Sequence, residues 1–175
     1  MYNVAIVGAG PAGIFAALEI TKLKPDWKVV LIEKGEKIEK RKCLLREGYE
    51  KCPSCKKCGL LCGWGGAGAF SDGKLTLTPD VGGNMLDYMS RKNVEDLIKY
   101  SDELYLKFGA TEEVFGTEME TFREIEREAA LAELKLVYSP VRHLGTERSL
   151  DVLKSMQDYL NEKITNKGKL EHIYT

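Results

Sequence analysis

The clearest pattern of hydrophobic and polar positions lies at the start of the chain. Residues 4–7 form a short apolar run, and residues 29–32 form a second run that ends at Glu33. Between the two runs, apolar side chains recur at helical spacing from Ile14 through Leu18. Short apolar runs are typical of buried strands, and the 3.6-residue spacing is typical of an amphipathic helix. The segment is therefore expected to fold as strand, helix and strand.

The turn between the first strand and the helix carries three glycines at fixed spacing, Gly8, Gly10 and Gly13. In dinucleotide-binding turns the first glycine makes the tight turn and the second lets the pyrophosphate approach the backbone. The third lets the helix pack closely on the strand. Pro11 suits the first helical turn, where its missing N–H is not needed. Glu33 can accept hydrogen bonds from ribose hydroxyls and would repel a 2′-phosphate, so the pattern predicts a dinucleotide other than NADP.

The region after Glu33 departs from this pattern. Residues 34–51 are charged, and residues 52–84 are punctuated by cysteine, glycine and proline, which predicts a long ordered loop that carries function. Thr117 and Glu120 have the spacing of a capping box at a helix start. Beyond the loop, hydrophobic spacing predicts helices over residues 85–108, from 117 and over 149–164, and strands over 134–138 and 170–174.

Composition sets broad limits on the class of protein. A chain of 175 residues fits one domain, or one domain with an insertion, and its 43% hydrophobic and 30% charged residues are typical of a globular protein. No apolar run reaches membrane-spanning length. The net charge of −1 gives no indication of nucleic-acid binding. No basic region precedes Val4, so we expect no secretory signal and a cytoplasmic location.

Charge is unevenly distributed along the chain. Residues 34–57 hold nine lysines and arginines and four acidic residues. A basic stretch beside a pyrophosphate site or around thiolates would have an electrostatic use. For most of these lysines, however, a solvated loop or helix face is the expected position.

All five cysteines lie between residues 43 and 62, and they are Cys43, Cys52, Cys55, Cys58 and Cys62. The last four have the spacing C-x2-C-x2-C-x3-C of bacterial ferredoxins, although Gly63 replaces the usual proline. Cys43 can alternatively be the fourth ligand, and four thiolates also suit zinc. A redox dithiol formed by Cys52 and Cys55, or reduced cysteines without a ligand, are the other hypotheses.

Residues 65–75 resemble the glycine-rich signature of a group of predicted FAD-dependent dehydrogenases, often named NAD(P)/FAD-dependent oxidoreductases, of bacteria and archaea. Residues 7–13 and 33–35 are similar to the first segment of that family, and residues 142–147 are similar to a third signature. Some members also carry cysteines before the glycine loop. The resemblance extends, in order, over essentially the whole chain.

The resemblance implies an α/β fold of the FAD/NAD(P)-binding, Rossmann-like three-layer type, incomplete at the C-terminus. Residues 1–175 would be a partial FAD-binding domain, with 1–33 and 146–175 as its core. Residues 34–145 would be an insertion that holds the Cys/Gly-rich loop 43–84 and helices. The residues expected at the cofactor are Gly8, Gly10, Pro11, Ala12 and Gly13 at the pyrophosphate, Glu33 and Lys34 at the ribose, and Gly65, Gly66, Ala67 and Gly68 on the flavin side. Arg142 and His143 would lie near the flavin without an assigned catalytic role.

The function implied is the N-terminal FAD-binding part of a flavin-dependent oxidoreductase, in which FAD carries the hydride or electrons. Family members are more than twice as long, so the expected partners are the missing C-terminal half, on the same or a separate chain, and a small-molecule substrate or electron carrier. The chain alone is expected to be inactive. Two alternatives are a non-catalytic module that combines an iron–sulfur cluster or zinc with a nucleotide, and a domain that binds NAD rather than FAD.

Overall fold

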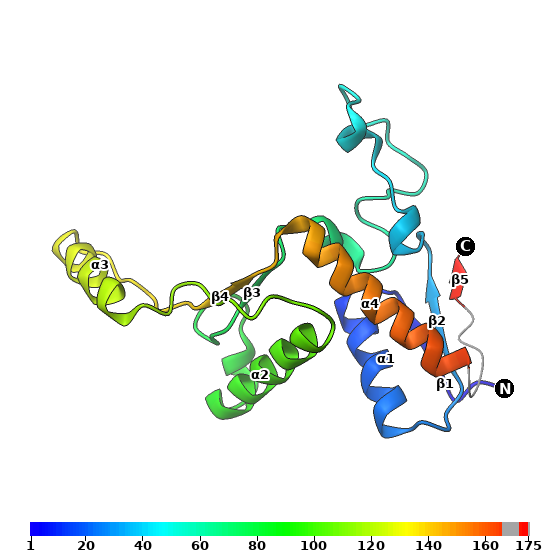
Figure 1. Cartoon of the computed structure of the whole chain (residues 1–175), viewed down its shortest axis with the longest axis horizontal. Helices are drawn as coiled ribbons and strands as arrows, with labels where there is room; N and C mark the ends of the chain where they lie inside the picture. Colours follow the sequence, from blue (N-terminus) through cyan, green and yellow to red (C-terminus); the bar gives the residue numbers. More distant parts are fainter. Residues whose placement is uncertain (166–171, 175) are drawn as a thin grey trace. The chain divides into compact units, whose positions relative to one another are not determined.

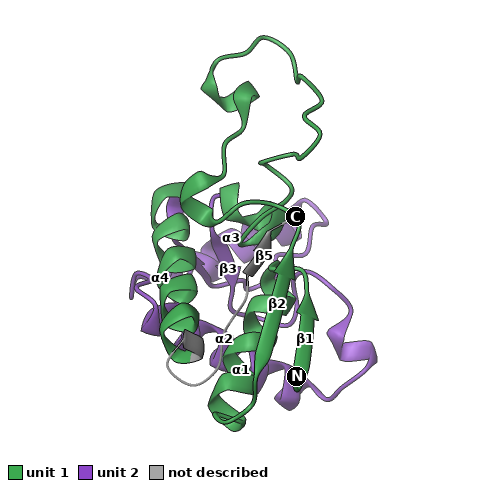
Figure 2. Ribbon diagram, turned by 90° about the vertical axis from the view of Figure 1, so that its right-hand side faces the viewer, with its two compact units in different colours: residues 1–71, 146–175 green, residues 72–145 purple. Residues whose placement is uncertain are grey.

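The structure, a computed structural model, describes residues 1–165 and 172–174. Figure 1 follows the elements along the chain. The chain divides into two compact units, one made of Met1–Ser71 with Thr146–Thr175 and the other of Asp72–Gly145 (Figure 2). Residues 170 and 171, which belong to the last predicted strand, lie outside the described residues.

The first unit contains a small parallel sheet and two α-helices. Its strands are in the order β1-β2-β5, with Val4 opposite Val29 and Leu31 opposite His172. Three short 3-10 segments cover residues 38–40, 44–47 and 66–70. The main elements are β1 (Val4–Val7), α1 (Pro11–Leu23), β2 (Val29–Glu33), α4 (Gly145–Thr165) and β5 (His172–Tyr174).

The predicted strand, helix and strand at the start of the chain are confirmed. Helix α1 begins at Pro11, whose ring fixes a backbone angle that suits the first helical turn. Its side chains Ile14, Ala17 and Leu18 are buried, and the helix packs on β1 and β2. Strand β2 lies between two other strands, and its residues are almost all buried. This burial explains why β2 has an unbroken apolar sequence.

The predicted fold class, a Rossmann-like three-layer fold, is wrong. The described residues form two small sheets, one of three parallel strands and one of two antiparallel strands. Helices α1 and α4 lie on one side of the parallel sheet, and within the described part of that unit no layer of helices covers the other side (Figures 1 and 2). The physical reason is that residues 72–145 fold as a unit of their own and add no strand to the parallel sheet.

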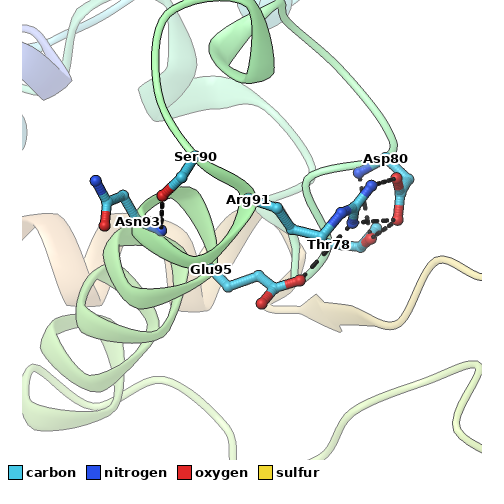
Figure 3. Close-up of polar contacts among 6 residues, drawn as sticks. All are labelled: Thr78, Asp80, Ser90, Arg91, Asn93 and Glu95. Carbon is cyan, nitrogen blue, oxygen red and sulfur yellow. Dashed lines mark hydrogen bonds and ion pairs between the residues drawn. The ribbon is translucent and has the colours of Figure 1, made fainter.

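The second unit is built around helix α2 and a two-stranded sheet. Its main elements are β3 (Lys74–Thr76), α2 (Arg91–Lys107), α3 (Met119–Leu131) and β4 (Val141–His143), with a 3-10 segment at Met85–Asp87. Strands β3 and β4 are antiparallel, and Leu75 lies opposite Arg142. Figure 3 shows how the start of α2 is fixed, since the Arg91 guanidinium contacts the Asp80 carboxylate at 2.6 Å.

Several predicted boundaries in the second unit differ from those observed. Helix α2 begins at Arg91 rather than near residue 85 because the Ser90 hydroxyl accepts a hydrogen bond from the Asn93 N–H (Figure 3). Helix α3 begins after Glu118, so the predicted capping box at Thr117 does not form. Residues 134–138 form no strand, and the strand of this region is instead β4, which pairs with β3.

No helix within residues 1–165 is both long enough and apolar enough to pass through a bilayer.

Candidate functional site

A cavity of about 500 Å³ lies beside the glycine turn, at the carboxyl ends of β1 and β2. Its walls combine apolar side chains, bare glycine backbone and one buried carboxylate. The residues that line it are Val7, Gly8, Gly10, Ile32, Glu33, Lys34, Leu61, Cys62, Gly63 and Gly66. Val7 is 82% exposed and Leu61 is 60% exposed, so apolar surface is open to any ligand that enters.

The glycine turn has one crowded side and one open side. A Cβ atom on Gly13 would lie 1.9 Å from the carbonyl oxygen of Gly8, so only glycine fits where α1 crosses the turn. Gly8 has φ of +96° and donates its N–H to the carbonyl oxygen of Ile32 at 2.7 Å. A Cβ atom on Gly10 would meet nothing within 4 Å. The backbone at Gly10 can therefore be approached closely from the cavity.

The Glu33 carboxylate is held by backbone amides. Its Oε2 accepts a hydrogen bond from the Ala9 N–H at 2.7 Å. Its Oε1 accepts from the N–H groups of Gly35 and Gly63, each at 2.9 Å. The side chain is 8% exposed, and burial raises its pKa, but these three hydrogen bonds and the charge of Arg41 outweigh burial and hold the pKa below its usual value. Glu33 is therefore ionised and connects the glycine turn to a second loop.

That second loop, residues 59–66, closes one side of the cavity. The Gly65 N–H donates to the carbonyl oxygen of Ala9 at 2.8 Å, and a Cβ atom on Gly66 would lie 3.2 Å from the Gly10 Cα atom. Gly35 also packs against this loop, because a Cβ atom there would lie 2.3 Å from the Gly63 backbone nitrogen. The two glycine-rich segments thus touch backbone to backbone, which bulkier residues would prevent.

The loop is anchored on its inner side by Trp64. Its side chain is fully buried, and its indole N–H donates to the carbonyl oxygen of Leu153 in α4 at 2.8 Å. The Trp64 backbone N–H donates to the Glu36 carbonyl oxygen at 3.0 Å. A buried tryptophan contributes a large apolar surface and needs a partner for its N–H, and α4 supplies that partner. The loop therefore cannot shift without disturbing the core.

Arg41 is the residue of this site that the sequence analysis missed. The sequence analysis counted it only as one member of the basic stretch of residues 34–57, without a role of its own, yet it is 6% exposed. Its guanidinium donates to four backbone carbonyl oxygens of the loop, those of Gly59, Leu60, Trp64 and Gly66, at 2.6–3.0 Å. Burial lowers the pKa of this group, and the nearby Glu33 carboxylate acts in the opposite direction. No local signal in the sequence distinguishes Arg41 from its neighbours, and only the fold brings the ring of Phe70 to 4.8 Å from the guanidinium carbon.

The other predicted cofactor residues lie at different positions. Pro11 and Ala12 are exposed at the start of α1, where the helix leaves backbone N–H groups without acceptors. Gly65 is buried against Leu153, and Ala67 and Gly68 are exposed in the 3-10 segment that begins at Gly66. None of these five residues lines the cavity. The structure therefore brings only part of the predicted set together.

Arg142 and His143 belong to the second unit. The Arg142 guanidinium forms an ion pair with the Asp102 carboxylate at 2.6 Å, and its side chain is 5% exposed. The ring of His143 is exposed and makes an edge contact with Phe115. Arg142 thus has a structural partner within its own unit.

The cysteines do not form a metal-ligand cluster. Cys52 and Cys55 are exposed, Cys43, Cys58 and Cys62 are half-buried, and only Cys62 lines the cavity. Within residues 1–165 and 172–174, no three histidine, cysteine or acidic side chains gather in a metal-binding arrangement. The iron–sulfur cluster and zinc therefore stay predictions made from cysteine spacing.

Comparison with known proteins identifies a relative of this chain. A Clostridium beijerinckii protein, named only as an uncharacterized protein, is 31% identical to this chain over 169 residues, which is 96% of this chain. The chain spans 27% of the length of that relative. No protein-family model matches the chain. Neither result names an activity, a cofactor or a substrate.

Proposed function

We propose that the cavity between the glycine turn and residues 59–66 binds the ADP portion of FAD. We further propose that the protein to which this site belongs is an FAD-dependent oxidoreductase. FAD, when bound, supplies the hydride or electron transfer, and the residues of this chain bind and orient its ADP portion.

The observation that carries the proposal is the open backbone at Gly10. It lines a cavity of about 500 Å³, at the N-terminus of a helix whose first N–H groups have no acceptor within the helix. A helix N-terminus favours anionic groups, and glycine lets a phosphate approach the backbone without meeting a Cβ atom. Phosphates of the pyrophosphate are therefore expected beside Gly10.

The remaining walls suit an adenosine. Each carboxylate oxygen has about two acceptor positions, and the Glu33 Oε2 atom accepts a backbone hydrogen bond from Ala9. It keeps capacity to accept a hydrogen bond from a ribose hydroxyl. The exposed apolar side chains of Val7 and Leu61 offer surface for a flat aromatic ring. The same ionised Glu33 would repel a phosphate on the ribose 2′ position.

The preference for FAD over NAD rests on the resemblance of residues 65–75 to the FAD-dependent dehydrogenases. Both dinucleotides contain ADP, so the cavity alone does not discriminate between them. Ala67 and Gly68 are exposed next to Gly66, which lines the cavity, and this exposure supports the proposal that the rest of the dinucleotide extends past them. Flavin binding is therefore the part of the proposal that needs its own measurement.

A competition titration tests the proposal. FAD would be titrated into the chain and followed by flavin fluorescence, and ADP, NAD and 2′-phosphorylated ADP would then be added as competitors. We expect saturable FAD binding, displacement by ADP, and binding of the 2′-phosphorylated ligand that is weaker by about tenfold or more. Displacement of FAD by none of these ligands would place the flavin elsewhere. ADP and NAD binding without FAD binding would favour the NAD alternative.

A further inference from the structure

We infer that Arg41 is a positioning residue of the ADP site, which holds residues 59–66 against the glycine turn. The inference rests on the proposed function for the identity of the ligand. Arg41 itself does not line the cavity. It acts through the loop whose backbone forms one wall.

The geometry of the guanidinium supports this role. Its Nε donates to the Gly59 carbonyl oxygen at 3.0 Å, and Nη2 donates to that of Leu60 at 2.8 Å. Its Nη1 donates to both Trp64, at 2.6 Å, and Gly66, at 2.8 Å. A single side chain therefore joins the two ends of the loop. Only arginine presents donors in a rigid planar fork that can satisfy acceptors spread over this distance.

One of these contacts fixes a residue of the cavity wall, because Gly66 lines the cavity. Gly66, whose carbonyl oxygen is bound by Arg41, lies beside Gly10, and the neighbouring Gly65 N–H is bonded to Ala9. Gly63 is fixed from the other side by Glu33. The loop is thus held between a buried cation and a buried anion. The Arg41 contact to Gly66 acts beside Gly10, where the pyrophosphate is expected, and the Glu33 contact to Gly63 acts where the ribose is expected.

The sequence around the loop is adapted to the arginine. A Cβ atom on Gly59 would lie 1.9 Å from the Lys42 carbonyl oxygen, and one on Gly63 would lie 2.8 Å from the Cδ atom of Arg41. Glycine at 63 therefore lets the loop backbone approach the arginine stem, and glycine at 59 lets it approach the backbone of Lys42, the next residue after Arg41. The ring of Phe70 covers the guanidinium, with 4.8 Å from its centroid to the Cζ atom. This aromatic contact favours the charged group in its buried position.

The test compares ADP and AMP affinities of wild type, Arg41→Lys and the control Lys40→Met by calorimetric titration. Lys40 is the exposed neighbour of Arg41. Lys40→Met removes one positive charge, a larger change in charge than Arg41→Lys, which keeps the charge. Because Arg41 acts at the pyrophosphate end, Arg41→Lys should lower the affinity for ADP by about tenfold and the affinity for AMP by about threefold or less. Lys40→Met should leave the ADP and AMP affinities within about twofold of the wild-type values. A purely structural role would lower both affinities equally.

Hydrogen exchange tests the positioning of the loop by Arg41 independently of ADP binding. In the absence of ligand, Arg41→Lys should speed exchange of the Gly63, Trp64 and Gly65 amides by about tenfold, with the Ile14 amide of α1 unchanged. If wild type binds no ADP but this change occurs, the proposed function fails and the positioning of the loop by Arg41 stands.

Phe70→Leu provides a milder variant should Arg41→Lys fail to fold. It removes the ring over the guanidinium and keeps all four carbonyl acceptors, so ADP affinity should fall by about threefold and AMP affinity by less. The inference is overturned if Arg41→Lys folds and has the same exchange rates of the loop amides and the same ADP affinity as wild type. If Arg41→Lys does not fold, the same result for Phe70→Leu overturns it. It is also overturned if ADP and AMP lose affinity by the same factor.

Discussion

The Gly63 N–H donates a hydrogen bond of 2.9 Å to the Glu33 Oε1 atom, across 30 residues of sequence. The contact joins the end of β2 to the loop at residues 59–66, and the same carboxylate also binds the Ala9 N–H of the glycine turn. Three segments that line the cavity therefore meet at a single buried anion. This arrangement gives Glu33 a structural role in addition to the ribose contact that its position predicts.

Replacing Glu33 with glutamine should destabilise the first unit. The glutamine amide can keep one oxygen acceptor, but its NH₂ group would face an N–H donor of Ala9 or of Gly35 and Gly63. We expect a loss of about 1–3 kcal/mol in the free energy of unfolding, because a buried donor loses its partner. Urea unfolding measures this loss, and Glu36→Gln at an exposed side chain is the matched control. Equal stability of the two variants would contradict the role assigned to Glu33.

The same carboxylate makes stability depend on pH. Burial raises the Glu33 pKa, but the backbone hydrogen bonds outweigh it, so the folded-state pKa lies below the usual value of 4.5. The unfolded chain then binds more protons, and the contribution of Glu33 is present above about pH 4.5 and lost as pH falls through the folded pKa. Unfolding free energies of wild type and Glu33→Gln should therefore converge below about pH 4. A constant difference between pH 7 and pH 3 would exclude this linkage.

Gly13 and Gly10 should respond in opposite ways to the same substitution. A methyl group at Gly13 would overlap the Gly8 carbonyl, so Gly13→Ala should lower the free energy of unfolding by about 3 kcal/mol or more. Gly10 has φ of −76° and open space around it, so Gly10→Ala should keep or raise stability by up to about 1 kcal/mol. Thermal unfolding of the two variants checks this contrast, and equal effects would argue against the observed turn geometry.

The buried ion pair of the second unit should contribute more than any exposed pair. Arg142 and Asp102 have side chains 5% and 15% exposed, and removing the carboxylate would leave the guanidinium without its charged partner. Asp102→Asn should therefore cost about 3 kcal/mol of unfolding free energy. Asp72→Asn, in the solvent-screened pair with Lys74, should leave the free energy of unfolding almost unchanged. Denaturant unfolding distinguishes the two, and a cost below 1 kcal/mol for Asp102→Asn would contradict the burial of the pair.

The local fold at the start of the chain was predictable because its signals are local. Two short apolar runs, three spaced glycines and Pro11 each act over a few residues. The structure has β1, α1 and β2 at the positions that these signals predict. The three-layer fold was inferred from resemblance to longer proteins, and no local signal marked residues 72–145 as a separate unit.

The site could be predicted only in part because its other half depends on contacts between distant segments. Arg41 resembles its exposed neighbours in sequence, and only the folded loop reveals that it binds four carbonyls. The Glu33 position was predicted, but its bond to Gly63 required knowing where the loop returns. Cysteine spacing suggested a metal, and in the described residues those side chains do not converge.

Titration of ADP into wild type and Gly10→Ala, followed by backbone amide chemical shifts, tests the central claim most directly. Gly10 lines the cavity and an added methyl group would meet no protein atom within 4 Å, so the fold should be kept while the closest approach of a phosphate to this backbone is blocked. We expect saturable shifts of Gly8, Gly10, Gly63 and Gly66 in wild type, and ADP affinity lower by about tenfold or more in Gly10→Ala at unchanged stability. Equal ADP affinity in the two proteins, or shifts confined to residues outside the cavity, would contradict the claim.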